Sequence, residues 1–112
     1  MEIVNITTGM TLARDARLAD GFFSRLKGLL GTKSLLLGEG LVIRPCNSIH
    51  TFGMNYPIDV VFAADGDRVA RTVTCLEPGR MLACRGSRYV VELPSGTVLR
   101  TGTKPGDQLR IG

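Results

Sequence analysis

The 112-residue sequence has no tryptophan, a single histidine and no apolar run that approaches the ~20 residues of a membrane-spanning helix. A transmembrane helix is therefore excluded. The first twelve residues also lack the charged-then-apolar pattern of a secretory signal, because Asn5, Thr7, Thr8 and Gly9 interrupt them. We expect a cytoplasmic protein.

Cysteine is scarce as well. Cys46, Cys75 and Cys84 form no C-x-x-C pair, and one thiol stays unpaired in any arrangement. This pattern is neither a disulfide framework nor a zinc signature, and His50 is the only imidazole that could join a metal site. We expect reduced, partly buried thiols, no bound metal and no cofactor.

Charge and aromatic content are both modest. The net charge is +4, and the chain holds only two tyrosines and four phenylalanines. A nucleic-acid-binding protein usually offers a denser basic stripe or more stacking aromatics. We expect an unidentified small ligand or a protein partner, with neither a nucleic-acid signal nor a membrane segment.

Glycine and proline, in contrast, are abundant. Fourteen glycines and five prolines divide the chain into short apolar runs, which is typical of strands joined by turns. No repeat or linker interrupts residues 1–112, so we expect one domain. The clearest hairpin turn is Asp65-Gly66, because glycine readily takes the positive φ of a tight turn. Strands are expected at Glu2–Thr7, Met10–Arg17, Leu41–Arg44, Ser48–Phe52, Ile58–Ala64, Arg68–Leu76, Arg88–Leu93 and Gln108–Ile111.

A short amphipathic helix is expected near residues 20–30, where apolar residues recur at helical spacing. Asp20 is its expected N-cap and Gly31 its expected stop. A weaker helical turn is expected over Gly96–Arg100, capped by Ser95 and stopped by Gly102. The predicted fold class is all-β (mainly β), a compact β-sandwich or partly open barrel with this helical cover.

The most distinctive run is RPCNSIHTFGMNYPID, residues 44–59. Further blocks are Ser24–Gly31, Gly38–Leu41, Val91–Gly96 and Gly106-Asp107. Together with Cys46–Phe62 they resemble domain-of-unknown-function family 192, a group of small bacterial and archaeal proteins. The resemblance implies a compact β-sandwich-like domain, and it carries over no catalytic residues.

An extended segment from Cys46 to Met54 would place Cys46, Ser48, His50, Phe52 and Met54 on one face. These residue types suggest a copper site, but at ~3.3 Å per residue Cys46 lies ~13 Å from His50, too far for one ion. The same distance disfavours Cys46 and His50 as nucleophile and base, although Cys75 or Cys84 could approach from another strand. We expect His50 to be half-buried and held by backbone or by Asp59.

Asp59 lies inside an apolar strand, on the face of Val61 and Ala63. A half-buried carboxylate there needs a partner, and Arg25, Arg44 or backbone amides near residues 54–56 could supply it. Glu92, between Val91 and Leu93, is a second carboxylate in an apolar run and needs a partner for the same reason. A separate run from Arg80 to Arg88 offers three arginines, Arg80, Arg85 and Arg88, as a weaker candidate for binding an anion.

The sequence thus predicts a small non-catalytic ligand-binding or accessory domain. Its shallow cleft is expected to involve Asn47, Ser48, His50, Met54 and Asp59. A hydrolase or thiol-dependent enzyme that uses His50 with a cysteine or carboxylate stays open and needs such a group within ~3 Å of the imidazole. A protein-interaction module also stays open and needs an exposed apolar patch or strand edge, for example at Phe52–Tyr56.

Overall fold

The structure is a computed structural model that describes residues 1–29 and 31–112. The strands are β1 (Ile3–Asn5), β2 (Met10–Ala13), β3 (Asp15–Ala19), β4 (Glu39–Ile43), β5 (Ser48–His50), β6 (Ile58–Ala64), β7 (Arg68–Leu76), β8 (Met81–Ala83), β9 (Tyr89–Pro94) and β10 (Leu109–Ile111). The helices are α1 (Phe22–Lys27), α2 (Thr97–Thr101) and the single 3₁₀ turn η1 (Asp65–Asp67). Strands hold 44% of the chain, so the prediction of a mainly β fold is confirmed.

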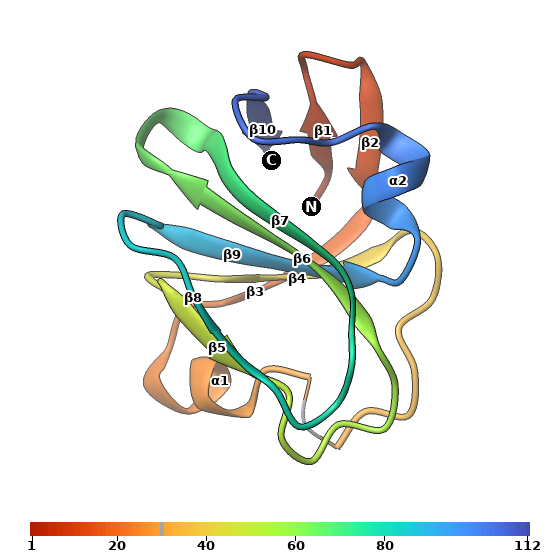
Figure 1. Cartoon of the computed structure of the whole chain (residues 1–112), viewed down its shortest axis with the longest axis vertical. Coiled ribbons are helices and arrows are strands. Elements are labelled where there is room, and N and C mark those ends of the chain that lie inside the picture. The colour runs from red at the N-terminus through yellow and green to blue at the C-terminus, as the bar shows by residue number, and fades with distance from the viewer. Residues whose placement is uncertain (30) are drawn as a thin grey trace.

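A five-stranded sheet organises the molecule, in the order β3-β4-β9-β6-β7 (Figure 1). Its β3 and β4 are parallel, and every other pair is antiparallel. In Figure 1 the three-stranded sheet β10-β1-β2 lies above it, and the β5-β8 pair lies below it with α1. The central strand is therefore β9, which is hydrogen-bonded on both edges.

The two faces of this sheet carry separate hydrophobic clusters. Val61, Ala63 and Val91 pack with residues of β1, β2 and α2. Val60 and Phe62 pack instead with residues from β4, β5 and the segments around them. This confirms the predicted alternation along β6, and it places the even-numbered positions of β9 on the face that α1 and β5 cover.

Strands β6 and β7 have the predicted bounds, and their connection at Asp65-Gly66 is the predicted turn, with Gly66 at φ +74°. The prediction of one strand over Met10–Arg17 is wrong. The backbone amides of Arg14 and Asp15 both donate to the carbonyl of Gly38, at 2.9 and 3.0 Å. The chain therefore leaves the three-stranded sheet after Ala13 and joins the five-stranded sheet at Asp15.

Helix α1 is shorter than predicted, and its caps differ. The backbone amide of Gly21 donates to the Ser24 hydroxyl at 3.0 Å, so Gly21 and not Asp20 is the N-cap. Gly28, at φ +51°, ends the helix three residues before Gly31. Leu30, the last residue of the predicted helix, lies outside the described residues. No helix among the described residues is long and apolar enough to cross a membrane.

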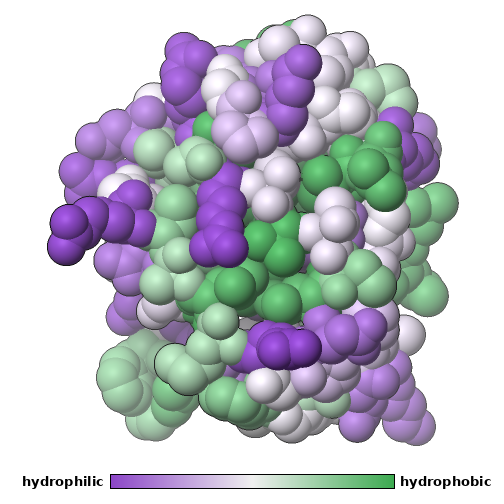
Figure 2. All heavy atoms as spheres, viewed as in Figure 1, coloured by the Kyte–Doolittle hydropathy of each residue, from purple (hydrophilic) through white to green (hydrophobic). Residues whose placement is uncertain are grey.

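The apolar residues of α1 do not pack against the sheet, contrary to the amphipathic prediction. Phe22, Phe23 and Leu26 are 68%, 80% and 64% exposed. Figure 2 shows hydrophobic side chains at the lower left of the molecule, where Figure 1 places α1, and across the middle of the same face. An exposed apolar patch of this kind often marks a surface that binds a ligand or a protein partner.

Candidate functional site

A cleft of about 370 Å³ lies between α1 and the segment that contains β5. This volume is within the range of small-molecule sites. Four of the five predicted cleft residues line it: Asn47, Ser48, His50 and Met54. Its other lining residues are Phe22, Arg25, Leu26, Lys27, Gly28, Leu29, Ile43, Pro45, Cys46, Ile49, Phe52 and Glu92.

Glu92 is the main polar group on the sheet side of the cleft. It sits on β9 directly between Leu41 of β4 and Val60 of β6, and it is only 3% exposed. No described residue donates a hydrogen bond to its carboxyl group, and no described cation lies within 4.0 Å of it. Burial raises the pKa of Glu92 from 4.5 to about 7, because an ionised carboxylate loses its hydration there.

The turn after α1 brings backbone close to Glu92. A methyl group at Gly28 would lie 3.8 Å from Oε1 of Glu92. The positive φ of Gly28 also disfavours any other residue at this position. Glycine thus lets the helix end against the carboxyl group without filling the cleft.

Arg25 lies on the α1 side of the cleft, and Cys46 lies on the side of the β5 segment. Nη1 of Arg25 donates to the carbonyl of Pro45 at 3.1 Å, and its Nε is buried with no partner among the described residues. The Cys46 thiol donates to the carbonyl of Ser48 at 3.0 Å. Burial raises the pKa of the Cys46 thiol, and this effect outweighs the smaller lowering by the hydrogen bond to Ser48. The thiol is therefore neutral and a poor nucleophile near neutral pH.

His50 lies at the cleft edge with its ring stacked on Phe52, the centroids 5.4 Å apart and the planes 25° apart. The prediction of a half-buried imidazole held by backbone or by Asp59 is wrong. His50 is exposed, and no described residue hydrogen-bonds its ring. Thr51 is buried and the chain turns at Gly53, so Met54 leaves the strand face and packs in the core.

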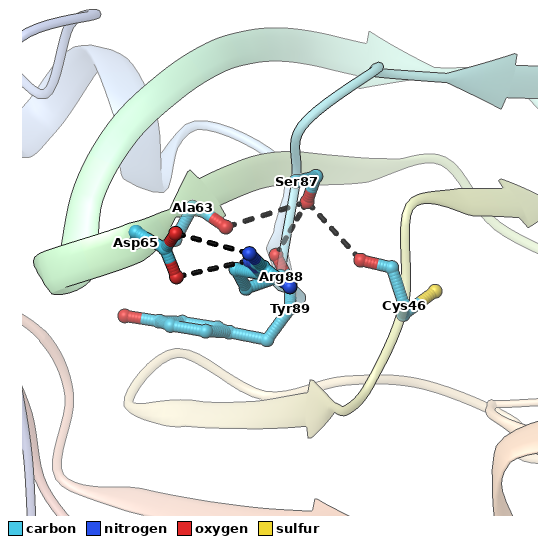
Figure 3. Close-up of polar contacts among 6 residues, drawn as sticks. All are labelled: Cys46, Ala63, Asp65, Ser87, Arg88 and Tyr89. Carbon is cyan, nitrogen blue, oxygen red and sulfur yellow. Dashed lines mark hydrogen bonds and ion pairs between the residues drawn. The ribbon is translucent and has the colours of Figure 1, made fainter.

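Ser87 fixes the wall that carries Cys46. Its hydroxyl lies 2.9 Å from the carbonyl of Tyr89, 3.2 Å from that of Cys46 and 3.4 Å from that of Ala63 (Figure 3). The backbone amide of Cys46 also donates to the carbonyl of Arg88 at 3.0 Å. The segment before β5 is therefore anchored to β6 and β9, which makes this wall part of the rigid scaffold.

Asp59 does not line the cleft. It is fully buried, not half-buried, and its carboxylate accepts from the backbone amides of Cys75 at 2.9 Å, Gly96 at 3.1 Å and Val98 at 2.8 Å. These donors differ from the predicted partners, which were Arg25, Arg44 and amides near residues 54–56. Asp59 joins β7 to the start of α2, and it takes the capping role expected of Ser95.

The three arginines predicted to bind an anion lie around β8, which the sequence analysis did not predict. Met81–Ala83 pairs with β5, so the segment is partly a strand and not a free loop. Arg88 pairs with Asp65, with Nε 2.9 Å from Oδ1 (Figure 3). Among the described residues no carboxylate lies within 4.0 Å of Arg80 or Arg85, so anion binding there stays a prediction.

Metal binding gains no support from the geometry. The described residues contain no group of three or more histidine, cysteine, aspartate or glutamate side chains that could hold an ion. Cys46, Cys75 and Cys84 are all free thiols.

The sequence analysis named Glu92 but did not place it in the cleft, and it did not assign Gly28 or Phe22 to a site. The alternation along Val90–Pro94 indicates which face Glu92 takes. The elements that cover that face are α1 and the β5 segment. Their position over the sheet depends on contacts between residues distant in sequence, which the local sequence pattern does not reveal.

Comparison with known proteins identifies relatives over nearly the whole chain. The DUF192 family model, described as an uncharacterised ACR, matches residues 3–111. A UPF0127 protein of Pyrococcus horikoshii is 35% identical over 114 residues, covering 96% of this chain and 96% of that protein. A UPF0127 protein of Pyrococcus furiosus is 32% identical over 111 residues, covering 96% and 95%.

Two solved structures share the fold. A protein of unknown function from Novosphingobium aromaticivorans has a TM-score of 0.85 at 24% identity, covering 98% of this chain and 82% of its own. A protein of Sinorhizobium meliloti has a TM-score of 0.84 at 23% identity, covering 97% and 89%. These likenesses concern the fold alone.

Proposed function

The chain belongs to the DUF192 family, which is described as uncharacterised, and we propose that it binds a small ligand in the cleft beside α1, without catalysing a reaction. One observation carries this proposal. The Glu92 side chain is 3% exposed and lines the cleft, and no described residue hydrogen-bonds or pairs with its carboxyl group. A ligand in the cleft can therefore reach this carboxyl group without displacing a described partner.

The proposed site differs from the predicted one in one member. It keeps Asn47, Ser48, His50 and Met54, and Glu92 replaces Asp59 as the polar anchor. A thiol-dependent enzyme is less well supported, because the Cys46 pKa is raised and no described hydrogen bond links a cysteine to His50.

A fragment screen by amide NMR tests the proposal. We expect fragments that bind to shift the amide resonances of Gly28, Ile49 and Glu92, which line the cleft. Ser48→Trp should weaken this binding, because Ser48 is exposed on the cleft wall and a large side chain there narrows the cleft. The matched control is Ser95→Trp, an exposed serine outside the cleft lining, which should bind fragments as the unmodified protein does.

Two results would contradict this function. Binding that is unchanged by Ser48→Trp, or resonance shifts confined to other surfaces, would move the site elsewhere.

The exposed phenylalanines of α1 also favour a docking surface for a protein partner as a second candidate. Phe23→Ser distinguishes ligand binding from protein docking, because Phe23 is 80% exposed and does not line the cleft. This variant should keep ligand binding in the cleft and should lose docking of a protein partner on α1.

A further inference from the structure

Arg25 and Lys27 line the same cleft as Glu92, but neither pairs with its carboxyl group. The neighbours of Glu92 on the sheet, Leu41 and Val60, are apolar. Ionising a carboxyl group in such surroundings is costly unless a cation or several donors compensate it. The compensating group must therefore come from across the cleft.

The charged and titratable groups that face Glu92 across the cleft do not provide this compensation. From α1, Arg25 donates to Pro45 and is more than 4.0 Å from the carboxyl group, and Lys27 is exposed. From the β5 segment, the Cys46 thiol donates to Ser48 and His50 is exposed. Nη1 of Arg25 and the Cys46 thiol are bonded to backbone carbonyls, Lys27 and His50 are exposed, and Nε of Arg25 is buried without a described partner but does not pair with Glu92.

The remaining walls suit an apolar body with a cationic end. Ile43 and Met54 are buried and line the cleft with Leu26. At the edge, Phe52 stacks on His50 and is itself 49% exposed. Aromatic faces attract cations as well as apolar groups, so this pair can accept either part of such a ligand.

We propose that the ligand class of the cleft is a small organic amine, whose protonated nitrogen pairs with the Glu92 carboxylate while its apolar body lies against Leu26, Ile43 and Met54. This inference rests on the proposed function, because it names the ligand of the same site. A neutral alcohol could hydrogen-bond Glu92 without compensating its charge, and a carboxylate would oppose that charge.

Three probes with the same ring and different end groups test the amine preference. They are 2-phenylethylamine, 2-phenylethanol and 3-phenylpropionate, titrated against the full chain and followed by amide NMR. Near pH 8 we expect the amine to bind at least about tenfold more tightly than the alcohol, because only the amine pairs with an ionised carboxylate. The carboxylate is expected to bind more weakly than either.

The preference should depend on pH and on Glu92. Between about pH 5.5 and pH 8 the affinity for the amine should rise, because Glu92 must lose its proton to form the pair. Glu92→Gln should abolish both the preference and its pH dependence. His50→Gln removes the only imidazole of the chain, and the rise with pH should persist in it. Glu77→Gln, at an exposed glutamate outside the cleft lining, is the matched control and should behave as the unmodified protein.

The possible failures are distinguishable. If none of the three probes shifts the cleft amides, both the proposed function and the amine inference lose their support. If the probes bind in the cleft but the alcohol or the carboxylate matches the amine, only the amine inference is wrong. The amine inference is equally overturned if Glu92→Gln keeps the amine preference.

Discussion

Replacing the buried Asp59 with alanine is expected to lower the melting temperature more than replacing an exposed carboxylate such as Asp65. Asp59 is fully buried and accepts three backbone hydrogen bonds, from Cys75, Gly96 and Val98. Loss of an acceptor that serves three backbone donors should cost about 3 kcal/mol of folding free energy. For a domain of this size that corresponds to a drop of roughly 12 °C or more, measured by calorimetry.

Two further variants make this test specific. Asp65→Ala removes an exposed carboxylate that pairs with Arg88 at the surface, and it should cost about 0–1 kcal/mol. Asp59→Asn keeps one oxygen acceptor, which can serve β7 or α2 but not both. The melting temperature of this variant should lie between those of Asp59→Ala and Asp65→Ala. Equal melting of Asp59→Ala and Asp65→Ala would show that Asp59 does not connect β7 and α2.

Replacing Glu92 with glutamine is expected to stabilise the protein at alkaline pH. The folded state holds the Glu92 proton up to about pH 7, whereas the ordinary pKa of a glutamate is 4.5. Between these values the folded state binds more protons than the unfolded state, so the free energy of unfolding falls as pH rises. The full difference amounts to about 3 kcal/mol above pH 7, because one pKa unit corresponds to about 1.4 kcal/mol.

Chemical denaturation at several pH values measures this effect. Glu92→Gln and the unmodified protein should differ little near pH 5, and near pH 8 the variant should be the more stable one by about 3 kcal/mol. Glu77→Gln, at an exposed side chain, should show no such divergence. A Glu92→Gln variant that loses stability as the pH rises, relative to the unmodified protein, would mean that a cation already compensates the carboxylate.

Short-range patterns in the sequence predict a large part of this fold. The alternation along Ile58–Ala64 and the Asp65-Gly66 turn give β6, β7 and their faces, because strand period and turn chemistry are local properties. Helical spacing locates α1, although its bounds are two to three residues off. The break at Arg14 is not predictable in this way, because it depends on hydrogen bonds to Gly38, which is distant in sequence.

The site is harder to predict than the fold for the same reason. The run from Asn47 to Met54 is recognisable as one wall, and six of its residues line the cleft, among them four of the five predicted site residues. Asp59 is a strong candidate for the site because it is a carboxylate inside an apolar strand. Its partners, however, are backbone amides from β7 and α2, which no pattern of side chains predicts. Glu92 becomes a candidate only when the covering elements leave its carboxyl group without a described partner.

The most direct test of this account is a ¹³C NMR titration of the Glu92 side-chain carboxyl group, assigned by its loss in Glu92→Gln. The account predicts a pKa near 7 in the free protein, where burial disfavours the ionised form. Saturating 2-phenylethylamine should lower that pKa, because the bound cation favours the carboxylate. A carboxyl group that titrates near 4.5 in the free protein and does not respond to the amine would contradict it.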